Sequence, residues 1–425
     1  MEDARAHLNR RAAAPGGKAG LSILAVAHLP FFRGGARTVD MGGGAIVHAE
    51  LFPRLAQLGH TVRVIAEAPP AQVGQDRAGL SWDVPNLTVE WFAFAYCSGA
   101  TPPPPSYGEV TKNRIKPLFD RLVREEKPDV VIIGRETLVW HVPDLCQEYR
   151  LPSLLIAHGS PTSGLLRGIY PEAVKRELVK RFHQVDAIVA VGKHLAEILR
   201  GLGVTRVCTI PNVADPTRFH PAPKDHGLLR DLRIAPDQVV VGHLSTLKRG
   251  KRPFDIIGSA ELVLRSDPQL VYLIIGDGPC RKEMEELGQS KGIAASFRYV
   301  GEIDHQQVPR YVNLSDIVLL PSEREGLSLV GCEAQACGRT LLMSDIPAAY
   351  ETIVDGETGV LYRLGDLHDL AAKTLALARD PLLRHRIGEK ARAAAARQTL
   401  EQWVRTYEEV LRRTALRLSP AAGES

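Results

Sequence analysis

Residues 316–338, DIVLLPSEREGLSLVGCEAQACG, constrain the fold more tightly than any other stretch of this chain. The apolar run at 316–320 predicts a buried strand, the polar segment after it predicts a loop, and the residues from about Leu327 predict a helix. The strand is apolar on both faces, which is typical of a parallel sheet covered by helices on either side. We therefore expect one strand–loop–helix unit of a doubly wound α/β domain.

The same alternation extends from this unit toward both ends of the chain. Apolar runs of strand length alternate with amphipathic segments such as AIVHAELFPRLAQLG (45–59) and PEAVKRELVKRF (171–182). This rhythm predicts doubly wound parallel sheets. The predicted strands are 21–28, 61–68, 87–95, 129–134, 153–159, 187–192 and 206–212 in the N-terminal half, and 239–245, 270–278, 297–301, 316–322, 340–345 and 359–365 in the C-terminal half.

A proline-rich segment, PNVADPTRFHPAP (211–223), separates the two halves and predicts a linker. We therefore expect an N-terminal Rossmann-like domain at 20–214 and a C-terminal one at 215–395, with a hinge near residue 215. Two such domains facing each other would place a ligand site at the carboxyl ends of their strands.

The two ends of the chain differ from these domains. A helix is expected at 396–418, with Trp403 and Tyr407 on one stripe; it packs either on its own domain or back on the first one. Residues 1–19 are rich in Ala, Arg and Gly and lack the apolar core of a secretory signal. We expect these residues to be a disordered leader and 419–425 to be a disordered tail.

The composition is that of an ordinary globular protein, with 44% hydrophobic and 24% charged residues. A net charge of +4 over 425 residues, without aromatic residues among the basic runs, argues against a nucleic-acid partner. No apolar run reaches the roughly 18 residues of a membrane-spanning helix. The six cysteines are scattered without a CxxC pair, so we expect reduced thiols in a cytoplasmic protein. Abundant Ala and Arg are typical of a GC-rich bacterial genome.

Two glutamates of the opening stretch are candidate ligand-binding residues. Glu325 and Glu333 are eight residues apart, about 12 Å along a helix, and a carboxylate can accept hydrogen bonds from neighbouring hydroxyls. Such a pair can hold the two ends of a nucleotide sugar, while the helix N-terminus between them offers N–H groups to the diphosphate. The alternative is that both are solvated. The apolar surroundings of Glu333 argue against it, because an unpaired buried carboxylate is costly.

Five segments together resemble the retaining GT-B glycosyltransferases of family 4, also named glycosyl transferases group 1. They follow the family's order and spacing and extend the resemblance over most of the chain: LPSLLIAHG, VDAIVAVGKHLAEILR, IPNVADPTRFHP, LIIGDGP and VPRYVNLSDIVLLPSEREGLSLVGCEAQACG. The resemblance implies a GT-B fold, in which two Rossmann-like domains face each other across a cleft, and retention of anomeric configuration. It also implies that Glu325 contacts the transferred sugar and Glu333 the ribose. The donor-binding loop and helix start then comprise Gly326, Leu327, Ser328 and Leu329.

A basic cluster in GHLSTLKRGKRP (242–253) is expected to stabilise the leaving diphosphate. The family usually has an Arg just after this strand and a Lys about five residues on, but here His243 or Thr246 stands at the Arg position. Both Lys248 and Lys251 are therefore predicted to act on the diphosphate, with Arg249 as a third candidate. The alternative is a solvated basic turn.

Further candidates lie at strand ends and before a helix. Gly43 and Gly44, in DMGGGAIVH (40–48), form either a flexible loop or a cradle that a diphosphate approaches closely. His158 ends an apolar strand; it is either structural or, as the resemblance implies, faces the reacting sugar and acceptor. The turn expected to shape the donor pocket comprises Gly276, Asp277 and Gly278.

The sequence contains no Asp-x-Asp pair, so basic side chains rather than a divalent metal are expected to hold the diphosphate. We expect no metal and no cofactor beyond the nucleotide-sugar co-substrate. The predicted function is retaining, metal-independent transfer of a hexosyl group. The C-terminal domain would bind the donor and the N-terminal domain the acceptor.

The acceptor is unidentified, and a small metabolite, sugar or sugar phosphate is favoured over a membrane lipid, because no strongly cationic amphipathic helix stands out. Peripheral membrane contact stays open. Acceptor selectivity is expected in residues 69–115. Two alternatives to transfer remain: a nucleotide-sugar epimerase or hydrolase on the same fold, which needs no acceptor, and a non-catalytic nucleotide-sugar-binding protein.

Overall fold

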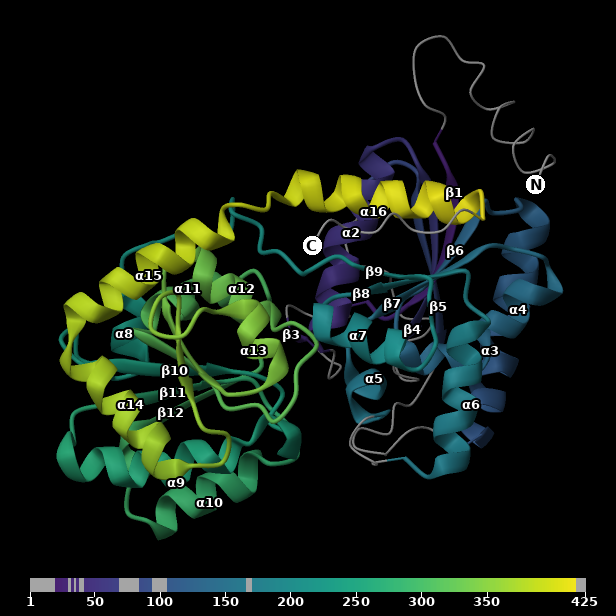
Figure 1. Cartoon of the computed structure of the whole chain (residues 1–425). Helices are drawn as coiled ribbons and strands as arrows, with labels where there is room; N and C mark the ends of the chain where they lie inside the picture. Colours follow the sequence, from purple (N-terminus) through teal and green to yellow (C-terminus); the bar gives the residue numbers. More distant parts are fainter. Residues whose placement is uncertain are drawn as a thin grey trace. The chain divides into compact units, whose positions relative to one another are not determined.

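The computed structural model describes residues 20–29, 32–33, 36–37, 42–68, 84–93, 105–165 and 170–417 (Figure 1). The predicted leader, the predicted tail and most of the predicted acceptor-selectivity segment at 69–115 lie outside these residues. The chain divides into two compact units. Unit 1 comprises residues 1–34, 41–211 and 401–425, and unit 2 comprises residues 35–40 and 212–400.

Unit 1 is built on a seven-stranded sheet in the order β5-β4-β1-β6-β7-β8-β9, with every strand pair parallel. Its strands are β1 (Ser22–Ala27), β4 (Thr61–Ala68), β5 (Leu87–Ala93), β6 (Val130–Ile133), β7 (Ser153–Ala157), β8 (Ala187–Ala190) and β9 (Val207–Thr209). Its helices are α2 (Gly43–Gln57), α3 (Pro105–Glu125), α4 (Val142–Glu148), α5 (Ser160–Leu165), α6 (Glu172–His183), α7 (Lys193–Gly201) and α16 (Leu400–Ala415), with a 3₁₀ turn at Glu136–Trp140. Outside the two large sheets, the short strands β2 (Phe32–Arg33) and β3 (Ala36–Arg37) form a two-stranded pair of their own.

Unit 2 repeats this architecture with a six-stranded parallel sheet in the order β12-β11-β10-β13-β14-β15. Its strands are β10 (Val240–Leu244), β11 (Val271–Ile275), β12 (Phe297–Gly301), β13 (Ile317–Leu320), β14 (Thr340–Ser344) and β15 (Val360–Tyr362). Its helices are α8 (His226–Asp231), α9 (Pro253–Ser266), α10 (Arg281–Ser290), α11 (Val308–Leu314), α12 (Leu329–Ala336), α13 (Pro347–Thr352), α14 (Leu367–Arg379) and α15 (Pro381–Ala395), with 3₁₀ turns at Arg249–Lys251 and Ala294–Ser296.

Both faces of the unit 2 sheet are buried, which explains its unbroken apolar strands. Along β11, Leu273 joins one hydrophobic cluster, whereas Tyr272 and Ile274 join the other. Because successive side chains of a strand point to opposite faces, the two clusters lie on opposite sides of the sheet. The predicted fold class, two doubly wound parallel α/β sheets, is confirmed.

Each sheet has one place where the strand order reverses. In unit 1, β1 lies between β4 and β6, and the strands that follow β4 and β6 in the chain extend the sheet in opposite directions. In unit 2, β10 lies between β11 and β13 in the same way. Ligands of open α/β sheets bind at such switch points, outside the carboxyl ends of the strands. The segments that follow β10 and β13 in unit 2, and those that follow β1 and β6 in unit 1, are therefore the first places to look for a site.

The C-terminal helix α16 belongs to unit 1 (Figure 1). Trp403 and Tyr407 are buried, with their ring centroids 5.0 Å apart. Glu408 lies 3.4 Å from Nε2 of the buried His60, at the start of β4. The apolar stripe seen in the sequence is thus a packing face of unit 1.

Candidate functional site

The loop after β13 leads into helix α12 at the switch point of unit 2. Ser328 caps this helix, because its side-chain oxygen accepts a hydrogen bond from the Gly331 N–H at 3.2 Å. The helix therefore starts at Leu329, two residues later than the sequence predicts. A hydrogen bond connects the loop before α12 to the predicted linker: the Asn212 side-chain amide donates to the Leu327 carbonyl at 3.0 Å.

Glu333 lies in the middle of α12 and is only 2% exposed. It is thus no solvated surface residue. Its carboxylate contacts Nε2 of His305 at 2.6 Å. His305 lies in the segment between β12 and α11, 28 residues earlier in the chain, and no sequence pattern singled it out.

Lys251 and Glu325 lie together. The Lys251 ammonium is 2.5 Å from a Glu325 carboxylate oxygen, with the two side chains 31% and 12% exposed. Lys251 comes from the segment after β10 and Glu325 from the loop after β13. The Glu323 N–H donates to the Gly250 carbonyl at 3.1 Å and ties these two segments at the switch point.

Arg249, by contrast, faces α10. Its guanidinium lies 3.2 Å from Glu283 and 5.6 Å from the centroid of the Phe254 ring, and its side chain is 78% exposed. Lys248 precedes the 3₁₀ turn that carries Arg249 and Lys251. Of the three basic candidates, the structure brings Lys251 to the predicted sugar-binding carboxylate.

His243 stands at one of the two positions where the resemblance expects an arginine, and it is buried at the end of β10. Its Nδ1 lies 2.8 Å from the Leu319 carbonyl, which can only accept, so Nδ1 carries the proton. Nε2 then accepts from the Ser245 hydroxyl at 2.7 Å. Burial, together with the nearby charge of Lys251, lowers the pKa of His243 to about 4. His243 therefore supplies no positive charge at neutral pH and instead links β10 to β13.

The turn after β11 packs directly against the segment after β10. A Cβ on Gly276 would lie 2.0 Å from the Ser245 carbonyl oxygen, and a Cβ on Gly278 would lie 2.8 Å from backbone atoms of Leu247. Both glycines also have positive φ, 112° and 155°. The carboxylate of the residue between them, Asp277, pairs with Arg281 at 2.9 Å. This turn therefore shapes the segment that carries Lys251.

In unit 1, His158 follows β7 and contacts a second histidine. Its Nε2 lies 3.2 Å from Nε2 of His48 on α2. Nδ1 of His48 lies 3.0 Å from the His28 carbonyl oxygen, which can only accept. Burial lowers the pKa of His48 to about 4 and that of His158 well below its usual value. With both rings neutral, His48 Nε2 accepts and His158 Nε2 donates.

Gly44 provides room for this pair. A Cβ at Gly44 would lie 3.0 Å from Cδ2 of His158, closer than a side chain normally approaches. Gly44 and His48 are four residues apart and share one face of α2. The sequence analysis did not identify His48 as a site residue, although its spacing of four residues from Gly44 is visible in the sequence. Gly43 is the exposed first residue of α2.

A buried carboxylate holds the loop that carries His158. Glu136 is 1% exposed and accepts hydrogen bonds from the N–H groups of His158 at 3.1 Å and Gly159 at 2.7 Å, and from the Thr162 hydroxyl at 3.2 Å. Burial raises the pKa of Glu136, although these bonds oppose the shift. Its place three residues after the apolar strand β6 was the available sequence signal, and the sequence analysis did not use it.

Arg135 and Glu67 extend this arrangement around His28. Nδ1 of His28 lies 2.7 Å from a Glu67 oxygen, and an Arg135 nitrogen lies 3.0 Å from Nδ1 and 2.9 Å from Nε2. Burial lowers the pKa of His28, and the Arg135 charge lowers it further. Four of these residues thus gather at the carboxyl ends of β1, β6 and β7, next to the switch point of unit 1: His28, Arg135, Glu136 and His158.

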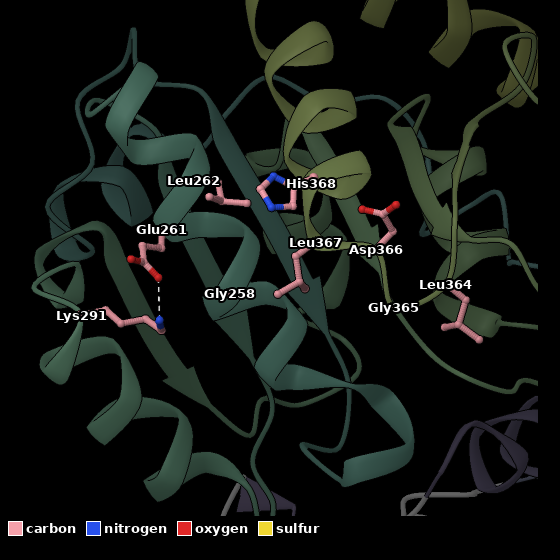
Figure 2. Close-up of a pocket in the computed structure, with 9 residues that line it drawn as sticks. All are labelled: Gly258, Glu261, Leu262, Lys291, Leu364, Gly365, Asp366, Leu367 and His368. Carbon is pink, nitrogen blue, oxygen red and sulfur yellow. Dashed lines mark hydrogen bonds and ion pairs between the residues drawn. The ribbon is translucent and has the colours of Figure 1, made fainter.

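A pocket with a volume of about 680 Å³, shown in Figure 2, lies elsewhere in unit 2. Glu261 and Lys291 on its wall pair at 2.5 Å, and none of the predicted site residues lines it. Within the described ranges, no helix is long and apolar enough to cross a bilayer. No group of three His, Cys, Asp or Glu side chains among them is arranged to hold a metal ion.

Two family models match consecutive parts of the chain. The model described as Glycosyltransferase Family 4 matches residues 41–218, and the model described as Glycosyl transferases group 1 matches residues 228–394. The first covers most of unit 1 and the second covers most of unit 2.

Two curated relatives illustrate the similarity in sequence. D-inositol 3-phosphate glycosyltransferase of Nocardia farcinica is 30% identical over 62% of this chain and 61% of that protein. N-acetyl-alpha-D-glucosaminyl L-malate synthase of Bacillus anthracis is 25% identical over 88% of this chain and 95% of that protein. The match thus spans less than two thirds of the first relative's length and nearly all of the second's.

Solved structures share the fold. The structure of Anabaena HepE in complex with UDP and glucose superposes with a TM-score of 0.74 at 18% identity, over 92% of this chain and 99% of that one. Sucrose-phosphate synthase from Thermosynechococcus elongatus superposes with a TM-score of 0.76 at 18% identity, over 92% and 98%. With both halves matched by family models and the fold shared, the chain belongs to the group 1 (family 4) glycosyltransferases of the GT-B fold.

Proposed function

We propose that this protein transfers a hexosyl group from a UDP-sugar to a small soluble acceptor, with retention of configuration and without a metal ion. The observation that carries the proposal is the arrangement at the switch point of unit 2. There the Lys251–Glu325 ion pair adjoins a loop that leads into the helix of the buried Glu333. This arrangement suits a ligand with hydroxyl groups at both ends and a diphosphate in the middle.

Each part of the donor has a proposed partner in unit 2. Glu325 accepts hydrogen bonds from hydroxyls of the sugar, and Glu333 accepts them from the ribose. Lys251 and the N-terminus of α12 stabilise the charge that develops on the diphosphate as it leaves. UDP is the first nucleotide to test, because the related HepE structures contain UDP and UDP-glucose.

Unit 1 is proposed to bind the acceptor. His158 is held neutral and donates to His48, so its Nδ1 keeps a lone pair that can accept a hydrogen bond. In the mechanism we propose, the bond between the sugar and the diphosphate breaks and an oxocarbenium-like sugar forms. The acceptor hydroxyl then attacks from the face that the diphosphate left and gives its proton to the departing diphosphate. The relatives named for inositol 3-phosphate and for malate make small anionic hydroxyl compounds the first acceptors to try.

A transfer assay tests this proposal. The protein is incubated in EDTA with UDP-glucose or UDP-N-acetylglucosamine, with and without a mixture of polyol phosphates, hydroxy acids and sugar phosphates. Mass spectrometry should show one added hexosyl group on an acceptor, with equimolar UDP released only when acceptor is present. The product's anomeric coupling in the proton NMR spectrum should match that of the donor.

Other outcomes would contradict specific parts of the proposal. Donor consumption at the same rate without acceptor would indicate a hydrolase or epimerase. Binding of the donor without turnover, across the acceptor mixture, would indicate a nucleotide-sugar-binding protein. Loss of transfer in EDTA with recovery in Mg²⁺ would contradict metal independence.

A further inference from the structure

The Glu333 carboxylate has a neighbour that the proposed mechanism does not use. A carboxylate that is 2% exposed is costly unless it is hydrogen-bonded. Within the described residues its hydrogen-bond partner is His305, whose Nε2 lies 2.6 Å from Oε1. No other described side chain hydrogen-bonds this carboxylate.

His305 is itself held from its opposite side. Nη2 of Arg218, in the segment after β9, lies 3.0 Å from Nδ1 of His305 and 3.0 Å from its carbonyl oxygen. A guanidinium can only donate, so Nδ1 accepts and Nε2 carries the proton toward Glu333. The ring also packs beside the buried Phe219, with centroids 5.6 Å apart. The tautomer and the orientation of His305 are therefore both determined.

This arrangement fixes the orientation of the Glu333 carboxylate and leaves one of its oxygens available to a ligand. One oxygen of Glu333 is occupied by a donor that is uncharged in this tautomer, and the second oxygen keeps its lone pairs. The nearby thiols do not compete as anions, because burial and the Glu333 charge raise the pKa of Cys332 to about 12, and burial raises that of Cys337 to about 12. A ligand hydroxyl that reaches this site meets a carboxylate oxygen that is held in one orientation and can accept a hydrogen bond.

We propose that His305, held by Arg218, is a positioning residue that aims the free oxygen of Glu333 at the ribose hydroxyls of the donor, so that the enzyme selects ribonucleotide over 2′-deoxyribonucleotide sugars. This inference rests on the proposed function, because it requires a nucleotide at Glu333. It excludes dTDP-sugars as efficient donors. A purely structural His305 would only tie the segment after β9 to α12.

Nucleotide pairs that differ by one hydroxyl separate these two roles. Isothermal titration is carried out with UDP and 2′-deoxy-UDP, and in parallel with the GDP and ADP pairs, on the full chain. For the preferred base, the wild type should bind the ribonucleotide at least about 10-fold more tightly, the size expected of a hydrogen bond to a charged group. In His305→Ala this preference should fall below about 3-fold, mainly through weaker binding of the ribonucleotide.

Three further variants make the test specific. His305→Gln keeps an amide N–H that can donate to Glu333, so it should show a larger ribose preference than His305→Ala. Arg218→Met keeps the imidazole of His305 but removes the group that orients it, so it should show a smaller ribose preference than the wild type. Gln306→Ala, an exposed neighbour in the same segment, should behave as wild type. These variants also keep the test valid if His305→Ala folds poorly.

The outcomes separate the inference from the function on which it rests. Binding by the wild type without a ribose preference, or an undiminished preference in both His305→Ala and Arg218→Met, would overturn the inference and leave the proposed function standing. If the wild type binds none of the ribonucleotides, the proposed function fails and the inference fails with it.

Discussion

Replacing Lys251 with methionine should lower kcat/KM for the nucleotide sugar by about 10²- to 10³-fold, the loss typical of removing one preorganised group that stabilises a developing negative charge. Lys251 contacts Glu325 at 2.5 Å, so its charge lies beside the proposed sugar-binding carboxylate. His243, at a position where the resemblance expects an arginine, is neutral and cannot substitute for it. Steady-state release of UDP in the presence of acceptor measures the effect.

The matched control is Lys282→Met. Lys282 lies on α10 of the same unit, and its side chain is 89% exposed. Removing this charge should change kcat/KM by less than about 3-fold. Lys251→Arg, which keeps the positive charge in a different shape, should retain more activity than Lys251→Met. Equal losses in the arginine and methionine variants would show that packing, and not charge, explains the role of Lys251.

Acid should destabilise unit 2 through His243. Its pKa is lowered from 6.5 to about 4 in the folded protein, so the unfolded chain binds a proton more readily at intermediate pH. The stability that this neutral histidine contributes is fully present above pH 6.5 and is lost as the pH falls toward 4. The shift corresponds to about 3 kcal/mol in the free energy of unfolding.

Hydrogen exchange of the β10 peptide, measured at increasing urea, reports on unit 2 directly. Tryptophan fluorescence is less direct, because the three tryptophans in the described part of the chain, Trp91, Trp140 and Trp403, lie in unit 1. Between pH 7 and pH 4.5 the wild type should lose about 2 to 3 kcal/mol more than His243→Gln, whose amide cannot titrate. Parallel pH curves for the two proteins would rule out His243 as the titrating group.

The fold could be predicted because its signal is local. Each apolar run of the sequence analysis contains a strand of the structure, since strands covered on both faces have no polar alternation to obscure them. The two-residue strands β2 and β3 were missed because two residues carry no periodicity. The start of α12 was placed two residues early, because the extended N-cap residue Ser328 looks like part of the helix in the sequence.

The site could be predicted only in part, because its contacts join distant segments. The burial of Glu333 follows from its apolar neighbours in the sequence, so it was expected. Nothing local indicates that His305 and Arg218, which are 87 residues apart, meet beside it. Similarly, the pairing of Arg249 with Glu283, 34 residues on, cannot be read from a basic cluster whose members look alike.

The central claim is that the carboxylates of unit 2 form a nucleotide-sugar site, and a thermal-shift measurement in EDTA tests it most directly. Wild type and Glu333→Ala are each melted with UDP-, GDP-, ADP- and dTDP-sugars. A ligand that binds the folded state raises the melting temperature, with a stabilisation of about 2.7 kcal/mol at 100 times its Kd. We predict that one ribonucleotide sugar raises the Tm of the wild type and leaves that of Glu333→Ala unchanged. Equal shifts in the two proteins would contradict the account, because the nucleotide would then bind elsewhere.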